Sequence, residues 1–323
     1  MTGELAVAAL PAVTERPGVD MSTSLGTFCP PNPIFTASGC AAAGQELAQF
    51  FDIADLGGVV TKSVMAQPRS GRATPRMAET PSGMLNSIGL QGPGIAAFLD
   101  HDLPWLTAHG ARAVVSIAGS SIEEYVTLAR ALRDQPGLAM IEVNISCPNV
   151  AERGQVFACD PWSAARVIGA IRDKAAPQVP VFAKLSPDVT DIVAVARAVV
   201  DAGADGLSMV NTALGMVIDT DTLRPALAGL TGGLSGPAIR PIAVRCVWQV
   251  HAAMPDVPIL GMGGIRTGLD ALQFVLAGAS AVSVGTAVFG DPSAPVRVLR
   301  ELTAALAERG FATLTDAVGY AHR

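Results

Sequence analysis

Short apolar runs alternate with longer amphipathic stretches along most of this chain. The short runs are rich in β-branched residues and have no polar face, which is typical of strands buried in a parallel sheet. The longer stretches carry apolar residues at helical spacing. The predicted strands are residues 33–37, 57–61, 113–118, 139–144, 180–185, 206–210, 257–261 and 281–284. The predicted helices are residues 45–51, 94–108, 121–133, 161–174, 189–202, 237–253, 268–277 and 294–307.

Eight strands that alternate with eight helices predict an α/β fold, the (β/α)8 TIM barrel. The alternative is an open, doubly wound sheet, but no Gly-x-Gly-x-x-Gly turn follows the first strand. Ser121, Thr190 and Asp191 are plausible helix caps, while Gly203 and Gly278 can end helices directly before strands. We predict one domain over residues 23–323, preceded by a loose leader over residues 1–22.

Polar residues and glycines gather where the predicted strands end. In a barrel, the residues that carry chemistry sit at the carboxyl ends of the strands. The end of the third predicted strand shows this pattern less clearly, although Ser116 within the strand can point inward. The other strand ends carry Ser38, Lys62 with Ser63, Asn144 with Cys147, Lys184 with Ser186, Asn211 with Thr212, Gly263 with Gly264, and Gly285 with Thr286.

Three long connections interrupt the alternation of strands and helices. Residues 65–94 follow the second strand, residues 212–234 follow the sixth, and residues 150–160 come shortly after Cys147. Loops of this length in a compact domain usually cover a ligand. We therefore expect them over the carboxyl-end face of the barrel, with residues 150–160 as a moving lid.

Glycine-rich turns follow the seventh and eighth predicted strands, at residues 261–264 and 285–286. In barrels these two loops often form a phosphate site, because backbone N–H groups and a helix N-terminus face the anion. Gly236, which opens the helix before the seventh strand, can add to this site. The alternative is that these glycines belong to ordinary turns.

Two lysines follow apolar runs. Lys184 should point into the barrel mouth, where a buried ammonium group needs an anionic partner. A reduced flavin carries negative charge at its N1–O2 edge, which a fixed cation stabilises. Lys62 could meet the flavin or a carboxylate substrate. A structural ion pair within the protein is the alternative.

Four asparagines and one cysteine complete the candidate chemistry. If Asn86, Asn144, Asn149 and Asn211 converge, their amides offer donors and acceptors to a small planar ligand such as a pyrimidine. Taken singly, each asparagine is more often a turn former or a helix cap. Cys147 has no histidine at a telling spacing, so it is better suited to general acid–base work than to Cys–His hydrolysis. The alternative, an inert buried thiol, fits poorly in a Ser-Cys-Pro-Asn turn.

Composition removes several other classes of protein. The chain has 323 residues and is 50% hydrophobic, which is ample for a large core. Its net charge of −6 disfavours a nucleic-acid surface. Five cysteines without a Cys-x-x-Cys pair indicate neither a disulfide framework nor a metal site. Without an apolar run of membrane-spanning length or a basic signal-peptide region, we expect a cytoplasmic protein with no membrane partner.

A set of motifs extends from about residue 32 to residue 292. It comprises Asn32-Pro33 with Ala37-Ser38-Gly39, Thr61-Lys62-Ser63, Gly83-Met84-Leu85-Asn86 with Gly89-Leu90-Gln91, Asn144-Ile145-Ser146-Cys147-Pro148-Asn149, Lys184-Leu185-Ser186-Pro187, Asn211-Thr212, Gly232-Gly233-Leu234-Ser235-Gly236, Gly261-Met262-Gly263-Gly264 and Gly285-Thr286. In these motifs the chain resembles dihydroorotate dehydrogenases of class 1, most closely the B subtype.

The resemblance implies oxidation of (S)-dihydroorotate to orotate in de novo pyrimidine biosynthesis. It implies that FMN takes a hydride and that Cys147 takes the C5 proton, which makes residues 23–323 an FMN-binding catalytic domain without a metal. The implied substrate-binding residues are Lys62, Asn86, Ser87, Ile88, Gly89, Leu90, Asn144, Asn149, Asn211 and Thr212. The implied FMN-binding residues are Ser38, Lys62, Ser63, Ser116, Asn144, Lys184, Val210, Gly236, Gly263, Gly264, Gly285 and Thr286.

The resemblance also implies a partner. The B subtype pairs with a subunit that carries FAD and a 2Fe–2S cluster and passes electrons to NAD. This chain lacks cysteines for such a cluster, so we expect a separate electron-transfer subunit and a homodimer or heterotetramer. Ser116 stands where the family has a flavin-contacting asparagine. Two alternatives stay open: an enzyme similar to dihydropyrimidine dehydrogenase, and a non-catalytic flavin-binding subunit.

Overall fold

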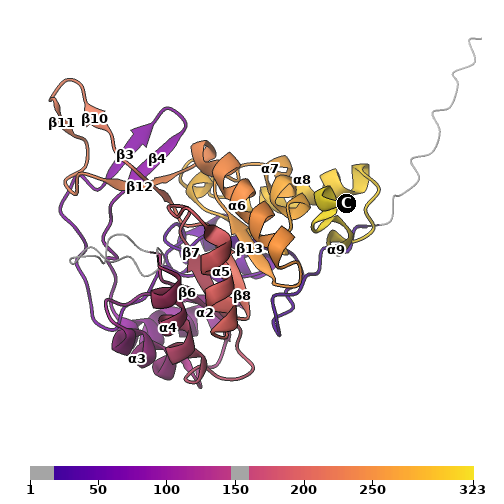
Figure 1. The fold of residues 1–323 in the computed structure, drawn as a ribbon, viewed down its shortest axis with the longest axis horizontal. Coiled ribbons are helices and arrows are strands. Elements are labelled where there is room, and N and C mark those ends of the chain that lie inside the picture. Colours follow the sequence, from indigo (N-terminus) through magenta and orange to yellow (C-terminus); the bar gives the residue numbers. More distant parts are fainter. Residues whose placement is uncertain (1–17, 147–159) are drawn as a thin grey trace, which may run out of the picture.

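The computed structural model describes residues 18–146 and 160–323, and eight parallel strands form a barrel at its centre (Figure 1). Their order around the barrel is β1, β14, β13, β8, β7, β6, β5, β2. Gly57 N–H donates to the Ile34 carbonyl at 2.8 Å and closes the ring between β1 and β2. The strands are β1 (Ile34–Thr36), β2 (Val59–Val60), β5 (Ala113–Ile117), β6 (Leu138–Asn144), β7 (Val181–Leu185), β8 (Gly206–Met209), β13 (Ile259–Met262) and β14 (Ala281–Val284). The predicted TIM barrel is confirmed.

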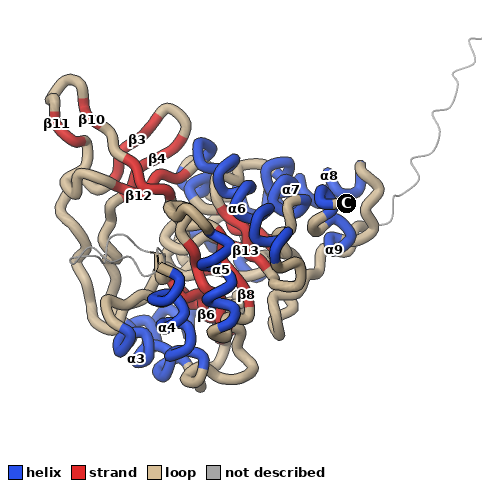
Figure 2. Tube along the Cα trace, viewed as in Figure 1, coloured by secondary structure: helices blue, strands red, loops and turns tan. Residues whose placement is uncertain are grey.

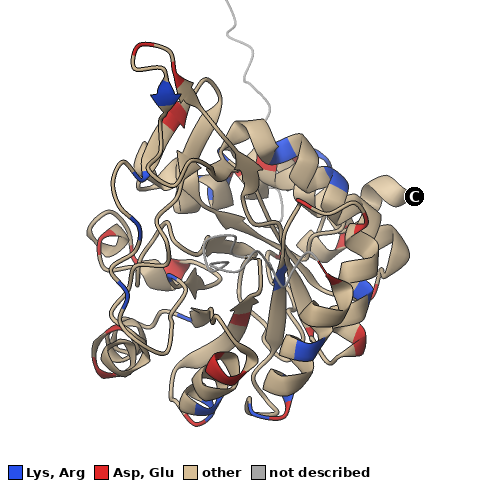
Figure 3. Cartoon of the chain, turned by 60° about the vertical axis from the view of Figure 1, so that its left-hand side comes forward, with Lys and Arg blue, Asp and Glu red and all other residues tan. Residues whose placement is uncertain are grey.

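Helices surround the strands, and Figure 3 shows acidic and basic residues interspersed over these outer helices. Ser121 and Asp191 accept hydrogen bonds from backbone N–H groups at the starts of α3 and α5, as predicted. The helices are α1 (Ile95–Ala97), α2 (Leu103–Ala108), α3 (Ile122–Leu132), α4 (Pro161–Arg172), α5 (Ile192–Asp201), α6 (Arg240–Ala253), α7 (Gly268–Leu276), α8 (Ala294–Glu308) and α9 (Leu314–Ala317). Within the described residues, no helix has both the length and the apolar character needed to cross a membrane.

The first two predicted helices need correction. Residues 45–51 contain only a 3-10 turn at Leu47–Gln49. The Asp52 side chain then accepts from Ala54 N–H and turns the chain again, which competes with continued helix. The second predicted helix, residues 94–108, is divided by a π-helical segment at Phe98–Asp102.

Two apolar cores hold the barrel together. The larger core lies between the strands and the surrounding helices. The smaller core fills the barrel interior with side chains that include Phe35, Met140, Phe182 and Leu260. Leu25 belongs to this inner core and is fully buried, so the segment before β1 packs against the barrel interior. The residues that line the cavity described below lie instead at the carboxyl ends of the barrel strands.

The long connections after β2 and β8 are not plain loops, contrary to our prediction. They form a four-stranded antiparallel sheet in the order β3, β4, β12, β9, called here the cover sheet, and a small β10–β11 hairpin. Figures 1 and 2 show these strands projecting together from one end of the barrel. The cover sheet consists of β3 (Met77–Thr80), β4 (Gly83–Asn86), β9 (Ala213–Gly215) and β12 (Gly232–Ser235), and the hairpin of β10 (Ile218–Asp219) and β11 (Arg224–Pro225).

The predicted leader, residues 1–22, is described only from residue 18 onward. In that part, Asp20 N–H donates to the Ala312 carbonyl at 3.0 Å, and Leu314 N–H donates to the Asp20 carbonyl at 2.8 Å. The start of the described chain is therefore tied to the segment before α9. The boundary at residue 22 stays a prediction.

Candidate functional site

A cavity of about 580 Å³ opens at the carboxyl end of the barrel, beneath the cover sheet. This volume is in the range of cofactor and substrate sites. The predicted site residues that line it are Ser38, Lys62, Ser63, Asn86, Ile88, Gly89, Leu90, Asn144, Lys184, Val210, Asn211, Thr212, Gly236, Gly263, Gly264, Gly285 and Thr286. The structure thus brings together residues spread over almost 250 positions of the chain.

Four predicted site residues are not in this lining. Ser87 is buried and accepts a hydrogen bond from Arg72 Nη1 at 3.1 Å. Ser116 is fully buried behind Ser63, with 2.9 Å between the two hydroxyl oxygens. Cys147 and Asn149 fall outside the described residues, as does most of the predicted lid.

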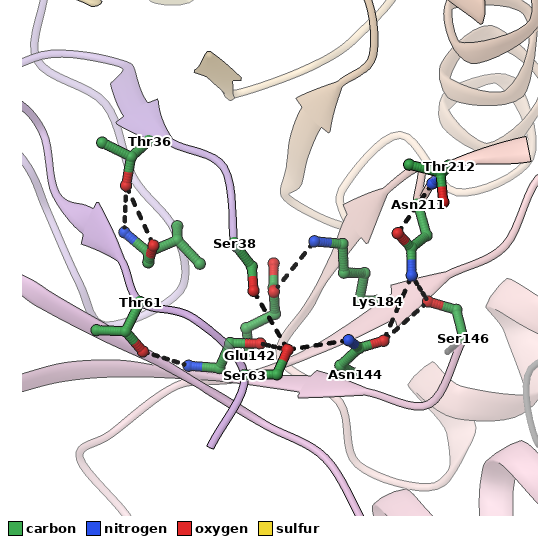
Figure 4. A network of polar contacts seen from close by, with 12 residues as sticks. Thr36, Ser38, Thr61, Ser63, Glu142, Asn144, Ser146, Lys184, Asn211 and Thr212 are labelled. Carbon is green, nitrogen blue, oxygen red and sulfur yellow. Dashed lines mark hydrogen bonds and ion pairs between the residues drawn. The ribbon is translucent and has the colours of Figure 1, made fainter. Parts of the chain in front are cut away.

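Hydroxyl and amide groups form a continuous network along the cavity wall (Figure 4). Asn144 Nδ2 donates to Ser63 Oγ at 3.0 Å, and Ser146 Oγ donates to Asn144 Oδ1 at 3.1 Å. Asn211 Nδ2 donates to Ser146 Oγ at 2.8 Å. Ser38 joins at the other end, with 3.2 Å between its hydroxyl oxygen and that of Ser63. Because each group fixes its neighbour, the amides present a set orientation to a ligand.

Lys184 forms a buried ion pair with Glu142 (Figure 4). Its Nζ lies 3.3 Å from Glu142 Oε1, and the side chains are 5% and 0% exposed. Lys184 lines the cavity, whereas Glu142 does not. The structural ion pair that we had considered as an alternative is therefore present, and the ammonium also borders the space for a ligand.

Cys40 lines the same cavity, on the segment that follows β1. Burial raises the pKa of its thiol to about 11, although the positive charges of Lys184 and Lys62 oppose the rise. Since a thiol with this pKa stays protonated near neutral pH, Cys40 is a neutral wall of the site and a poor nucleophile there.

Glycine turns line the end of the cavity near β13 and β14. Gly236, Gly263 and Gly264 have φ values of +91°, +132° and +75°. A Cβ atom at Gly264 would lie 2.7 Å from the Gly236 carbonyl oxygen. Thr286 Oγ1 donates to Ser235 Oγ at 2.8 Å and ties the last turn to the cover sheet. A close-packed backbone of this kind suits an anionic group such as phosphate.

The cover sheet positions Asn86, which pairs in register with Gly233 of β12. Asn86 Nδ2 donates to the Gly233 carbonyl at 3.4 Å. The turn after Asn86 is held from outside, because Arg69 Nε donates to the Gly89 carbonyl at 3.0 Å. Asn86 and this turn therefore reach the cavity on supported backbone.

Sequence reasoning missed several residues that shape the cavity or stand behind it. Cys40, Ser283 and Arg266 line it, and Glu142 supports Lys184. Glu142 could have been found, because it lies two residues before Asn144 and therefore on the same face of the strand.

Comparison with known proteins bears directly on this site. The family model of dihydroorotate dehydrogenase matches residues 22–306. The chain belongs to the dihydroorotate dehydrogenase family. A relative from Geobacillus kaustophilus is 49% identical over 288 residues, which cover 89% of this chain and 91% of the relative. A relative from Geobacter sp. (strain M21) is 47% identical over 305 residues, which cover 94% of this chain and 98% of the relative. Both relatives are named the catalytic subunit of dihydroorotate dehydrogenase B (NAD(+)).

Membership of this family confirms the resemblance and implies a flavin cofactor. Residues of the cavity fit such a group: Gly236, Gly263 and Gly264 line it with backbone alone, and a Cβ atom added at any of them would lie within 2.8 Å of neighbouring protein atoms. The buried Ser283 hydroxyl lines the cavity and has no hydrogen-bond partner among the described residues. Lys184 supplies positive charge at the same wall.

Proposed function

We propose that this chain oxidises (S)-dihydroorotate to orotate on bound FMN, as the catalytic subunit of a B-type enzyme. The observation that carries the proposal is the joint lining of one cavity by Lys184, the glycine turns and three of the four predicted asparagines. The names of relatives at 47% and 49% identity support the same activity.

In this proposal, one end of the cavity holds FMN. The glycine turns at residues 236, 263–264 and 285–286 receive its phosphate, while Ser38, Ser63, Asn144, Lys184 and Val210 border the ring system. When bound, FMN supplies the acceptor for the hydride from C6 of the substrate. Lys184 offers a fixed positive charge for the negative charge that develops during this step.

The substrate occupies the space beside the amide network. Asn86, Asn144, Asn211 and Thr212 orient the pyrimidine ring, together with Asn149 from outside the described residues. Lys62 and the backbone of the turn at residues 88–90 bind the carboxylate. Cys147 removes the C5 proton as general base. Ser116 supports the site through Ser63, where the two hydroxyl oxygens lie 2.9 Å apart.

The proposal is tested by anaerobic mixing of the purified, FMN-loaded chain with dihydroorotate or dihydrouracil. We expect dihydroorotate to bleach the flavin absorbance and dihydrouracil to leave it unchanged. Bleaching by dihydrouracil alone would assign the chain to the dihydropyrimidine dehydrogenase type. A flavin that stays oxidised with both compounds would indicate a non-catalytic flavin-binding subunit.

We further propose that electrons leave through a separate subunit carrying FAD and a 2Fe–2S cluster, in a cytoplasmic heterotetramer built on a homodimer of this chain. The term "catalytic subunit" in the names of the relatives supports the existence of a second subunit. After reduction by dihydroorotate, NAD should reoxidise the flavin rapidly only when the co-expressed partner is present. Fumarate and quinone serve as competing acceptors, and rapid NAD reduction by the isolated chain would contradict this assignment.

A further inference from the structure

The ion pair between Lys184 and Glu142 joins the cavity to the barrel interior. Glu142 lies on β6 in register with Phe182 of β7 and Ser116 of β5. Phe182 belongs to the inner core, so Glu142 projects into the barrel and not towards the helices. The carboxylate in this place is fully buried, and its in-register neighbours carry no charge.

Few polar contacts offset the charge of Glu142. Oε1 contacts Lys184 Nζ at 3.3 Å, and Oε2 has no hydrogen-bond partner among the described residues. An apolar pair would usually be no less stable here, because burying two charges carries a large desolvation penalty. Stability alone is therefore a weak explanation for an acid at this position.

The ion pair is asymmetric with respect to the cavity. Lys184 lines it and Glu142 stands behind Lys184 without reaching it. Ser208, which is in register with Lys184 on β8, and Ser283 also have buried hydroxyls without partners in the described chain. Lys62 and Arg266 also line the cavity, but Lys184 is the residue that pairs with a fully buried carboxylate standing behind the wall.

We propose that Glu142 is a positioning residue that holds the Lys184 ammonium at the cavity wall and compensates its charge. The reduction potential of a bound flavin is then set by the ion pair and not by Lys184 alone. This inference rests on the proposed function only in requiring that a flavin binds in the cavity. Removing the carboxylate leaves the cation uncompensated and stabilises the more negative, reduced flavin.

The test is an anaerobic potentiometric titration of the FMN-loaded protein against a reference dye. We expect Glu142→Gln to favour two-electron reduction about tenfold, equivalent to a potential about 30 mV higher. Lys184→Met should disfavour reduction by a similar factor. The double variant should lie within about threefold of wild type, since it removes both charges.

Asp205→Asn is the matched control, because it neutralises a carboxylate at the opposite end of the barrel, directly before β8, where Asp205 pairs with Arg172 at 2.8 Å. It should leave the potential unchanged. If Glu142→Gln does not fold, the comparison of Lys184→Met with the double variant measures the same loss of the carboxylate.

An unchanged potential in Glu142→Gln, or a shift in the same direction as Lys184→Met, would overturn the inference. So would an equal shift in Asp205→Asn, which would make the effect one of overall charge. The titration needs no substrate. A wild-type flavin that dihydroorotate fails to reduce would therefore defeat the proposed function while leaving this inference testable.

Discussion

Replacement of Gly264 by alanine tests whether the glycine turns work as a close-packed cradle. Gly264 has a φ of +75°, and an alanine in this left-handed region costs about 1–2 kcal/mol. Its Cβ atom would also lie 2.7 Å from the Gly236 carbonyl oxygen and 2.9 Å from Arg240 Cβ. Overpacking of this kind adds about 1–3 kcal/mol. We expect a total loss of about 2–5 kcal/mol, which most domains survive because they have about 5–15 kcal/mol of stability.

Gly290→Ala is the matched control on the same cavity. Gly290 has φ −99° and ψ −23°, and a Cβ atom there would meet no heavy atom within 4 Å. Alanine accepts this conformation, and the loss of freedom in the unfolded chain should raise stability by about 0.4–1 kcal/mol. Both substitutions add one methyl group. Opposite changes in the free energy of unfolding would therefore show that Gly264→Ala acts through backbone strain and crowding and not through the added methyl group itself.

Urea unfolding of the FMN-free protein measures the change in stability. A fluorescence titration with FMN then measures the dissociation constant of the folded variants. Gly264→Ala should raise this constant at least tenfold, because a displaced turn moves the backbone N–H groups that we propose bind the phosphate, and about 1.4 kcal/mol corresponds to tenfold. If Gly264→Ala matches Gly290→Ala in both measurements, the cradle reasoning is wrong.

Two further predictions concern the thiols. Cys147→Ala should slow flavin reduction by dihydroorotate on the order of 100-fold, as the loss of a general base does. The control Cys29→Ala, at an exposed thiol, should leave the rate unchanged. Equal rates for the two variants in stopped-flow measurements would show that Cys147 is not the general base. Burial raises the pKa of Cys40 from its ordinary 9.0 to about 11, so the folded state holds the thiol proton more tightly than the unfolded state. The associated stability is fully present below pH 9 and is lost as the pH rises towards 11, by about 2–3 kcal/mol at most. Thermal unfolding of Cys40→Ala should therefore depend less on pH between 9 and 11, and parallel curves for wild type and variant would refute this.

The barrel strands could be predicted because the residue types within each strand indicate that both of its faces are buried. Apart from Glu142 and the polar residues near their carboxyl ends, strands such as β6 and β7 are apolar on both faces, since one face meets the helices and the other fills the barrel. Polar residues such as Asn144 and Lys184 mark their carboxyl ends, where the cavity lies. The helix start at Ser121 was predictable for a similar reason, because capping depends on neighbours in sequence, and the same reasoning limited the next start to Thr190 or Asp191.

The helix predicted at residues 45–51 and the loops predicted after β2 and β8 failed for the opposite reason. Helical spacing in a short stretch does not overcome competing turns such as the one capped by Asp52. The cover sheet depends on β4 pairing with β12, about 150 positions later in the chain. The residue pattern within one of these two strands does not indicate which distant strand it will pair with.

The barrel, its functional end, the family and most residues of the cavity could be inferred from residue patterns, because burial periodicity and strand-end chemistry are local properties. Three contacts became visible only in the folded chain: Glu142 pairs with Lys184, Ser116 stands behind Ser63, and Ser87 accepts a hydrogen bond from Arg72. These contacts form when the barrel closes and the cover sheet assembles. Their geometry is set by the relative placement of strands, which no single stretch of residues encodes.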